Sequence, residues 1–134
     1  MVKFANVGLD TVVFKDCKMV GADFSNAKDF LFSINFNNCI LDYAAFIKKK
    51  NRKSTIENCS LKGADFSEAD FSESKFVNCD FSAAVFMRSN LNGANFVSSY
   101  NYTIDPEVNS LRKAKFSSSG LAGLLQNYGI IVAE

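Results

Sequence analysis

Large apolar residues recur at every fifth position along most of this chain. Five such positions precede a two-residue slip and fourteen follow it: Phe4, Leu9, Phe14, Met19 and Phe24, then Leu31, Phe36, Leu41, Phe46, Asn51, Ile56, Leu61, Phe66, Phe71, Phe76, Phe81, Phe86, Leu91 and Phe96. Only Asn51 is not a large apolar residue. An amphipathic helix repeats every 3.6 residues and a strand every two, so neither explains a period of five. The pattern instead predicts a repeat protein.

A second, smaller residue accompanies each large one. Two positions before the apolar residue the chain usually carries Ala, Cys or Ser, at Ala22, Cys39, Ala44, Cys59, Ala64, Ala69, Ser74, Cys79, Ala84, Ser89 and Ala94. One large and one small side chain in every five therefore point inward.

This unit resembles that of the pentapeptide-repeat family, written A(D/N)Lxx. It is matched here by "ADFSE", "SKFVN", "CDFSA", "SNLNG" and "ANFVS", and the resemblance covers residues 2–98. It implies an all-β fold, a right-handed quadrilateral parallel β-helix in which four pentapeptides make one coil.

The cysteines agree with a coil of four pentapeptides. Cys39, Cys59 and Cys79 follow one another at this interval, and Cys17 precedes Cys39 by the same interval plus the two-residue slip. All four should form one column at a small inward position, about 4.8 Å apart. The preceding Asn38, Asn58 and Asn78 should form an amide ladder.

A zinc site, disulfides or a nucleophilic cysteine would each need a different arrangement. Zinc sites typically use CxxC pairs or histidines, and this chain has neither. Parallel stacking holds the Cβ atoms side by side, and burial makes thiols poor nucleophiles. We interpret the cysteines as small core residues and expect no metal and no cofactor.

The basic run "KKKNRK", residues 48–53, has two interpretations. In a 20-residue coil three of its lysines each lie next to an acidic residue on the neighbouring strand: Lys48 by Glu68, Lys50 by Asp70 and Lys53 by Glu73. The same spacing places Asp42 by Lys62 and Arg88 by Glu68. Opposite charges on neighbouring strands contribute about 0.2–1 kcal/mol per pair. We favour this charge ladder over a phosphate-binding patch, which would require free cations.

Two irregularities interrupt the repeat. Lys49 and Asn51 occupy inward positions, and since buried polar groups need partners, the chain is expected to turn outward or loop there. At the slip, Phe30 and Phe32 flank Leu31 at outward positions. Either a bulge places one of them inside, or the pair forms an exposed contact site.

The C-terminal end changes character after Phe96. Leu111 and Phe116 keep the five-residue count, which predicts a last irregular coil and a division into a β-helix of residues 1–116 and a helix and tail of residues 117–134. Ser118 or Ser119 would begin a short α-helix and Gly129 would end it. Such a helix would cap the open end of the β-helix.

The run "LAGLLQNYGIIV" also resembles the C-terminal ends of family members that protect DNA gyrase from quinolones. In those proteins a terminal helix and tail mediate dimerisation. The resemblance implies a homodimer formed through Leu121, Leu124, Leu125, Tyr128 and Ile130.

Composition narrows the functional classes. There are 14 Phe, one Pro and neither Trp nor His, and the net charge is +1. Such a charge gives no general reason to bind nucleic acid or an anionic membrane. With no apolar run as long as a membrane span and no signal-peptide core, we expect a cytoplasmic protein.

The sequence contains no catalytic constellation, so we expect a non-enzymatic interaction protein. The family resemblance implies a bacterial duplex-DNA mimic that binds DNA gyrase or topoisomerase IV and protects it from quinolones. The acidic residues for this role would be Asp65, Glu68, Asp70, Glu73 and Asp80. The alternative is a scaffolding module with an unrelated protein partner, and neither direct nucleic-acid binding nor membrane binding is expected.

Overall fold

The chain coils with a 20-residue repeat. The computed structural model describes residues 11–25 and 33–133, and its four strands form one parallel sheet in the order β1-β2-β3-β4. They are β1 (Thr11–Lys15), β2 (Ser33–Asn37), β3 (Thr55–Glu57) and β4 (Lys75–Val77). Phe36 pairs with Ile56 and Ile56 with Phe76, whereas Phe14 pairs with Phe36 across a coil that is two residues longer. The predicted slip is confirmed.

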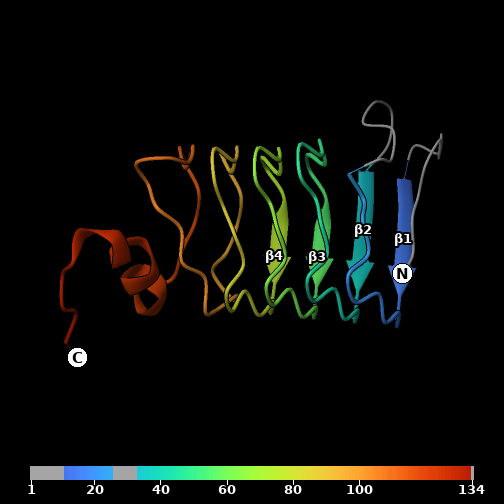
Figure 1. The fold of residues 1–134 in the computed structure, drawn as a ribbon, viewed down its shortest axis with the longest axis horizontal. Helices are drawn as coiled ribbons and strands as arrows, with labels where there is room; N and C mark the ends of the chain where they lie inside the picture. The colour runs from blue at the N-terminus through green and yellow to red at the C-terminus, as the bar shows by residue number, and fades with distance from the viewer. Residues whose placement is uncertain (1–10, 26–32, 134) are drawn as a thin grey trace.

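Bridges on the other sides of the coil follow the same register. Three columns of parallel bridges join Lys18, Ile40, Ser60, Asp80 and Tyr100; Asp23, Ala45, Asp65 and Val85; and Lys50, Asp70, Asn90 and Ser110. The strand column itself continues from Lys75 through Asn95 to Lys115. The chain is therefore a parallel β-helix whose coils stack side by side along one axis (Figure 1).

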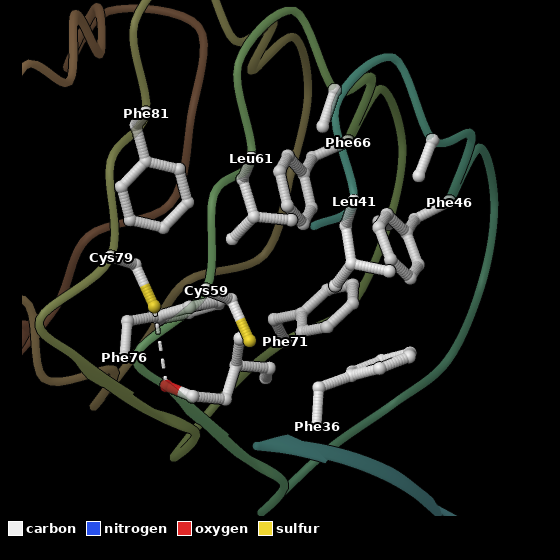
Figure 2. Packing of buried hydrophobic residues seen from close by; sticks show 14 of the residues in the cluster. Phe36, Leu41, Phe46, Cys59, Leu61, Phe66, Phe71, Phe76, Cys79 and Phe81 are labelled. Carbon is white, nitrogen blue, oxygen red and sulfur yellow. Dashed lines mark hydrogen bonds between the residues drawn. The ribbon is translucent and has the colours of Figure 1, made fainter. Parts of the chain in front are cut away.

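The five-residue positions form the core. Among the described residues up to Phe96 all of them are buried except Phe14, which is half-buried, as are Leu111 and Phe116 in the last coil. Because the parallel register places like residues one strand apart, Phe24, Phe46, Phe66 and Phe86 stack with ring centroids 5.0, 5.1 and 4.9 Å apart. Figure 2 shows Phe46 and Phe66 of this stack together with Leu41 and Leu61 pointing into the interior.

Lys49 and Asn51 do not turn outward, so the predicted loop is wrong. Both are buried, and the coil keeps its register, with the Asn51 N–H donating to Asp70 O over 2.8 Å. The Asn51 amide is satisfied inside: its Oδ1 accepts the Ile34 N–H at 2.7 Å and its Nδ2 donates to Ile34 O at 3.0 Å. A paired polar group can be buried at little cost.

Left-handed residues turn the chain at the corners between Phe14 and Gly93. Each described residue two positions after a described inward five-residue position there has positive φ; Asn38, Asn58 and Asn78 have φ of 56°, 56° and 52°. Asn tolerates this conformation better than most residues. The predicted amide ladder is confirmed between Asn78 Nδ2 and Asn58 Oδ1, 3.3 Å apart, whereas Asn38 Nδ2 donates to Asp16 Oδ1 at 2.8 Å.

The C-terminal segment is helical, but the predicted α-helix is wrong. It forms two 3₁₀ helices, η1 (Ser118–Leu124) and η2 (Gln126–Tyr128), at the end of the coil stack farthest from β1 (Figure 1). The Ile104 N–H donates to Gly123 O at 3.0 Å, and this hydrogen bond joins η1 to the last coil. Ser117 precedes η1 without a side-chain cap, and Gly129 ends η2 with φ 68°, as predicted.

Two glycines let this segment lie directly on Tyr102. A Cβ at Gly120 would lie 1.8 Å from Tyr102 Oη, and one at Gly123 would lie 2.1 Å from Tyr102 O. Leu124 packs against the buried core from the same segment. Phe30 and Phe32, the predicted aromatic contact pair, fall outside the described residues.

Candidate interaction surfaces

The cysteine column is part of the core. Cys39, Cys59 and Cys79 are buried and Cys17 packs against the core, which confirms the packing interpretation, and all four thiols are free. Figure 2 shows Cys59 beside Cys79, whose Sγ donates to Ile56 O at 3.3 Å. Burial raises the pKa of Cys59 to about 12 and that of Cys79 to about 11. These thiols therefore stay protonated at neutral pH and are poor nucleophiles.

Other kinds of site are scarce on the described surface. Within residues 11–25 and 33–133, no group of three or more His, Cys, Asp or Glu side chains could hold a metal ion. No helix in this part of the chain is both long and apolar enough to span a membrane. The remaining candidates are charged edges of the coil and the C-terminal groove.

The predicted acidic residues do not share one face. Asp65, Asp70 and Asp80 belong to three different bridge columns. Glu68 and Glu73 occupy the left-handed corners on either side of Asp70. Only Glu68, Asp70 and Glu73 therefore lie together, on one face of one coil.

The aspartates among them also have structural roles. Asp70 Oδ1 accepts the Ser72 N–H at 3.0 Å and its hydroxyl at 2.6 Å, and Asp80 Oδ1 binds Ser82 in the same way. Asp65 Oδ1 accepts the backbone N–H two residues later at 2.9 Å. Burial alone would raise the pKa of Asp80, but hydrogen bonds from Ser82 and Asn101 lower it below its usual value. These carboxylates hold the corner turns.

Part of the predicted charge ladder is present. Lys53 lies 3.9 Å from Glu73, and Arg88 lies 3.8 Å from Glu68, as the 20-residue count predicts. Arg52 adds a further contact with Glu73 at 3.4 Å. Both glutamates are thus paired with cations of neighbouring coils.

Two predicted ion pairs are wrong. Within residues 33–133, Lys48 forms no ion pair, because Glu68 turns to the coil on its other side and binds Arg88. Asp42 is short and accepts the backbone N–H of Lys62 at 3.1 Å, whereas the Lys62 ammonium lies 3.9 Å from Asp80.

An apolar groove of about 510 Å³ lies at the C-terminal end. It is lined by Pro106, Leu121, Leu124, Leu125, Tyr128 and Ile130. All five residues predicted for dimerisation thus meet in one place. Pro106 was not among the residues predicted for this site.

Polar contacts hold one side of this groove against the last coil. Tyr128 Oη donates to Glu107 Oε1 at 3.0 Å, which raises the Tyr128 pKa, and Asn127 Nδ2 donates to Asp105 Oδ2 at 2.9 Å. Ile130 is nevertheless 55% exposed. The groove is formed by the chain but left uncovered by the described residues.

Solved structures similar to this chain include the following three. A pentapeptide repeat protein from the thylakoid lumen of Arabidopsis thaliana is 24% identical, with a TM-score of 0.62 over 72% of this chain and 67% of that one. A pentapeptide repeat protein of the cyanobacterium Cyanothece is 12% identical, with a TM-score of 0.50 over 88% and 84%. The plasmid-mediated fluoroquinolone resistance protein QnrB1 is 18% identical, with a TM-score of 0.43 over 99% and 92%.

No curated protein sequence matches the chain. The family model described as "Pentapeptide repeats (8 copies)" matches residues 64–99. These residues lie within the coils whose bridges follow the 20-residue register. Residues 64–99 therefore match the pentapeptide-repeat family, and the coils have the fold of a solved pentapeptide repeat protein.

Proposed function

We propose that this chain acts without catalysis, as an interaction rod built on a right-handed quadrilateral β-helix. The proposal is supported by the four bridging positions in each coil, which make a stiff frame, and by the open apolar groove at one end. The rod comprises residues 1–116, and residues 117–134 provide the contact end. The protein works in the cytoplasm, where its free thiols stay reduced.

The groove receives a second copy of the chain. Leu121, Tyr128 and Ile130 are 44%, 46% and 55% exposed although they are large and apolar. Exposed apolar surface that is gathered in one patch marks an interaction site. A two-fold arrangement would place the groove of one copy against the groove of the other and cover both.

Light scattering after size-exclusion chromatography tests this association. We expect a dimer at 100 µM and a monomer for Leu121→Asp/Ile130→Asp, because the substitutions place charge in the contact. Val97→Asp is the control, since Val97 is 47% exposed but belongs to the coil and not to the groove. A wild-type monomer at 100 µM would rule the dimer out.

DNA gyrase or topoisomerase IV is the first partner to test. The family resemblance supports this choice, together with the shared face of Glu68, Asp70 and Glu73. The ion pairs of Glu68 and Glu73 reduce the acidity of that face and favour a scaffold with another protein partner.

A supercoiling assay with a quinolone separates the two possibilities. A DNA mimic would protect gyrase and lose protection on Asp70→Lys/Glu73→Lys. Unchanged quinolone inhibition at stoichiometric protein would eliminate gyrase, and a pull-down that enriches one specific protein without a topoisomerase would establish the scaffold.

A further inference from the structure

The coil carries a cluster of cations that lack acidic partners. Lys75, Arg112, Lys113 and Lys115, here called the basic edge, are all exposed. None of the four forms an ion pair within residues 33–133, in contrast to Arg52 and Lys53, which both contact Glu73. The charge of the basic edge is therefore available to a partner.

The register brings these four cations together from distant parts of the sequence. Lys75 is bridged to Asn95, and Asn95 to Lys115, so the two lysines stand two strands apart, about 10 Å. Arg112 and Lys113 form the adjoining corner, where the Gly93 N–H donates to Arg112 O at 2.8 Å. The signal was present in the sequence, since eight pentapeptides, or two whole coils, separate Lys75 from Lys115.

Amide groups between the cations add further donors. Asn90 Oδ1 accepts the Asn92 N–H at 3.1 Å, Asn92 Oδ1 accepts the Arg112 N–H at 2.8 Å, and Asn95 Oδ1 accepts the Val97 N–H at 2.9 Å. Each amide oxygen is thus used by the backbone, and the Nδ2 groups donate to nothing within residues 33–133. The surface offers hydrogen-bond donors and positive charge, which suits an anionic acceptor.

The edge lacks the apolar residues that a protein partner would need. The exposed large apolar side chains of the described coil all lie elsewhere, and residues 70–75, 90–95 and 110–115 contribute none. Stable protein interfaces have an apolar core. Contacts to a phosphate backbone need only charge and hydrogen-bond donors.

We propose that the basic edge binds the phosphate backbone of a nucleic-acid duplex, without reading its sequence. A groove of about 490 Å³ runs beside Arg112 and Lys113, and Gly93 leaves its wall without a side chain. Asp70 and Glu73 also line this groove. The Glu73 carboxylate is already paired with cations of the neighbouring coil, and Asp70 Oδ1 accepts hydrogen bonds from Ser72. The inference departs from the sequence-based expectation of no nucleic-acid binding, which rested on the net charge and on residues 48–53 and did not consider these four cations.

Fluorescence anisotropy with a labelled 20-base-pair duplex of arbitrary sequence, in 50 to 200 mM KCl, tests the proposal. Four neutralised phosphates predict a log–log salt slope of about −3.6, or about 150-fold weaker binding across this range. Arg112→Gln/Lys113→Gln should halve the slope. The control Lys18→Gln/Lys62→Gln removes the same charge from the other side of the coil and should leave it unchanged.

Three results would overturn the proposal. One is the absence of binding at 50 mM KCl, and another is an equal loss of affinity in the control variant. The third concerns competition at equal concentrations of negative charge. If polyglutamate displaces the labelled duplex more effectively than unlabelled DNA does, the basic edge binds an acidic protein instead. Circular dichroism of each variant confirms that the coil is intact.

Discussion

The stacked phenylalanine column should stabilise the coil beyond ordinary apolar burial. Phe66 lies face to face between Phe46 and Phe86, at centroid distances of 5.1 and 4.9 Å. Phe71 in the same coil is equally buried, with 1% exposure for each, but its column neighbours are Asn51 and Leu91, so it has no parallel-stacked ring. Phe66→Leu and Phe71→Leu are therefore the same chemical change, but only Phe66→Leu removes stacked rings.

The expected difference follows from the ring pairs. An aromatic pair contributes about 0.5–1.5 kcal/mol beyond its buried area. Because Phe66→Leu removes the two stacked pairs with Phe46 and Phe86, its unfolding free energy should fall about 1–3 kcal/mol further than that of Phe71→Leu. The loss of ring volume is common to both variants and cancels in the comparison.

Urea unfolding followed by circular dichroism measures this difference. The midpoints and slopes of wild type, Phe66→Leu and Phe71→Leu give the three free energies. Equal destabilisation of the two variants within about 0.5 kcal/mol, or a larger effect of Phe71→Leu, would refute the reasoning from stacking.

Two further predictions concern the cysteine column and the C-terminal contact. Burial raises the pKa of Cys59 to about 12 and that of Cys79 to about 11. Above about pH 9 the unfolded chain loses these protons while the folded chain keeps them, so the free energy of unfolding falls as pH rises. Urea unfolding at pH 8 to 11 should show this decline weakened in Cys59→Ala/Cys79→Ala; identical pH profiles would contradict it. Gly123→Ala places a methyl 2.1 Å from Tyr102 O and should cost about 1–3 kcal/mol and speed chymotrypsin cleavage near the C-terminus. In the control Gly129→Ala the added methyl meets no atom, and the left-handed backbone alone should cost about 1–2 kcal/mol. Faster cleavage in Gly129→Ala but not in Gly123→Ala would count against the contact between Gly123 and Tyr102.

Much of the architecture was readable from the pattern of apolar residues. Each inward position recurs in every coil with the same surroundings, so it accepts the same class of side chain. The five-residue period, the two-residue slip before residue 33 and the cysteine column can therefore be recognised in the sequence. The structure confirms each of them within the described residues. The confirmed ion pairs, Lys53 with Glu73 and Arg88 with Glu68, follow from the same arithmetic.

Polar groups inside the coil were harder to predict, because their partners come from the tertiary fold. Asn51 breaks the repeat in sequence, yet it stays buried because its amide meets both backbone groups of Ile34, from the preceding coil. The C-terminal segment is held on the last coil because the Ile104 N–H donates to the Gly123 carbonyl and Tyr102 lies against Gly120 and Gly123. Neither contact has a local signature.

The surface depended on the structure most of all. Acidic residues close together in sequence separate onto different bridge columns, since every five residues the chain turns a corner. Conversely, Lys75 and Lys115 approach one another because two complete coils separate them. Sequence by itself determined which residues point inward, because each coil repeats the same steric position, and its 20-residue count brought outward charges such as Arg88 and Glu68 near one another. Only the folded coil decided which of these charges pair, because a side chain can turn to the coil on either side.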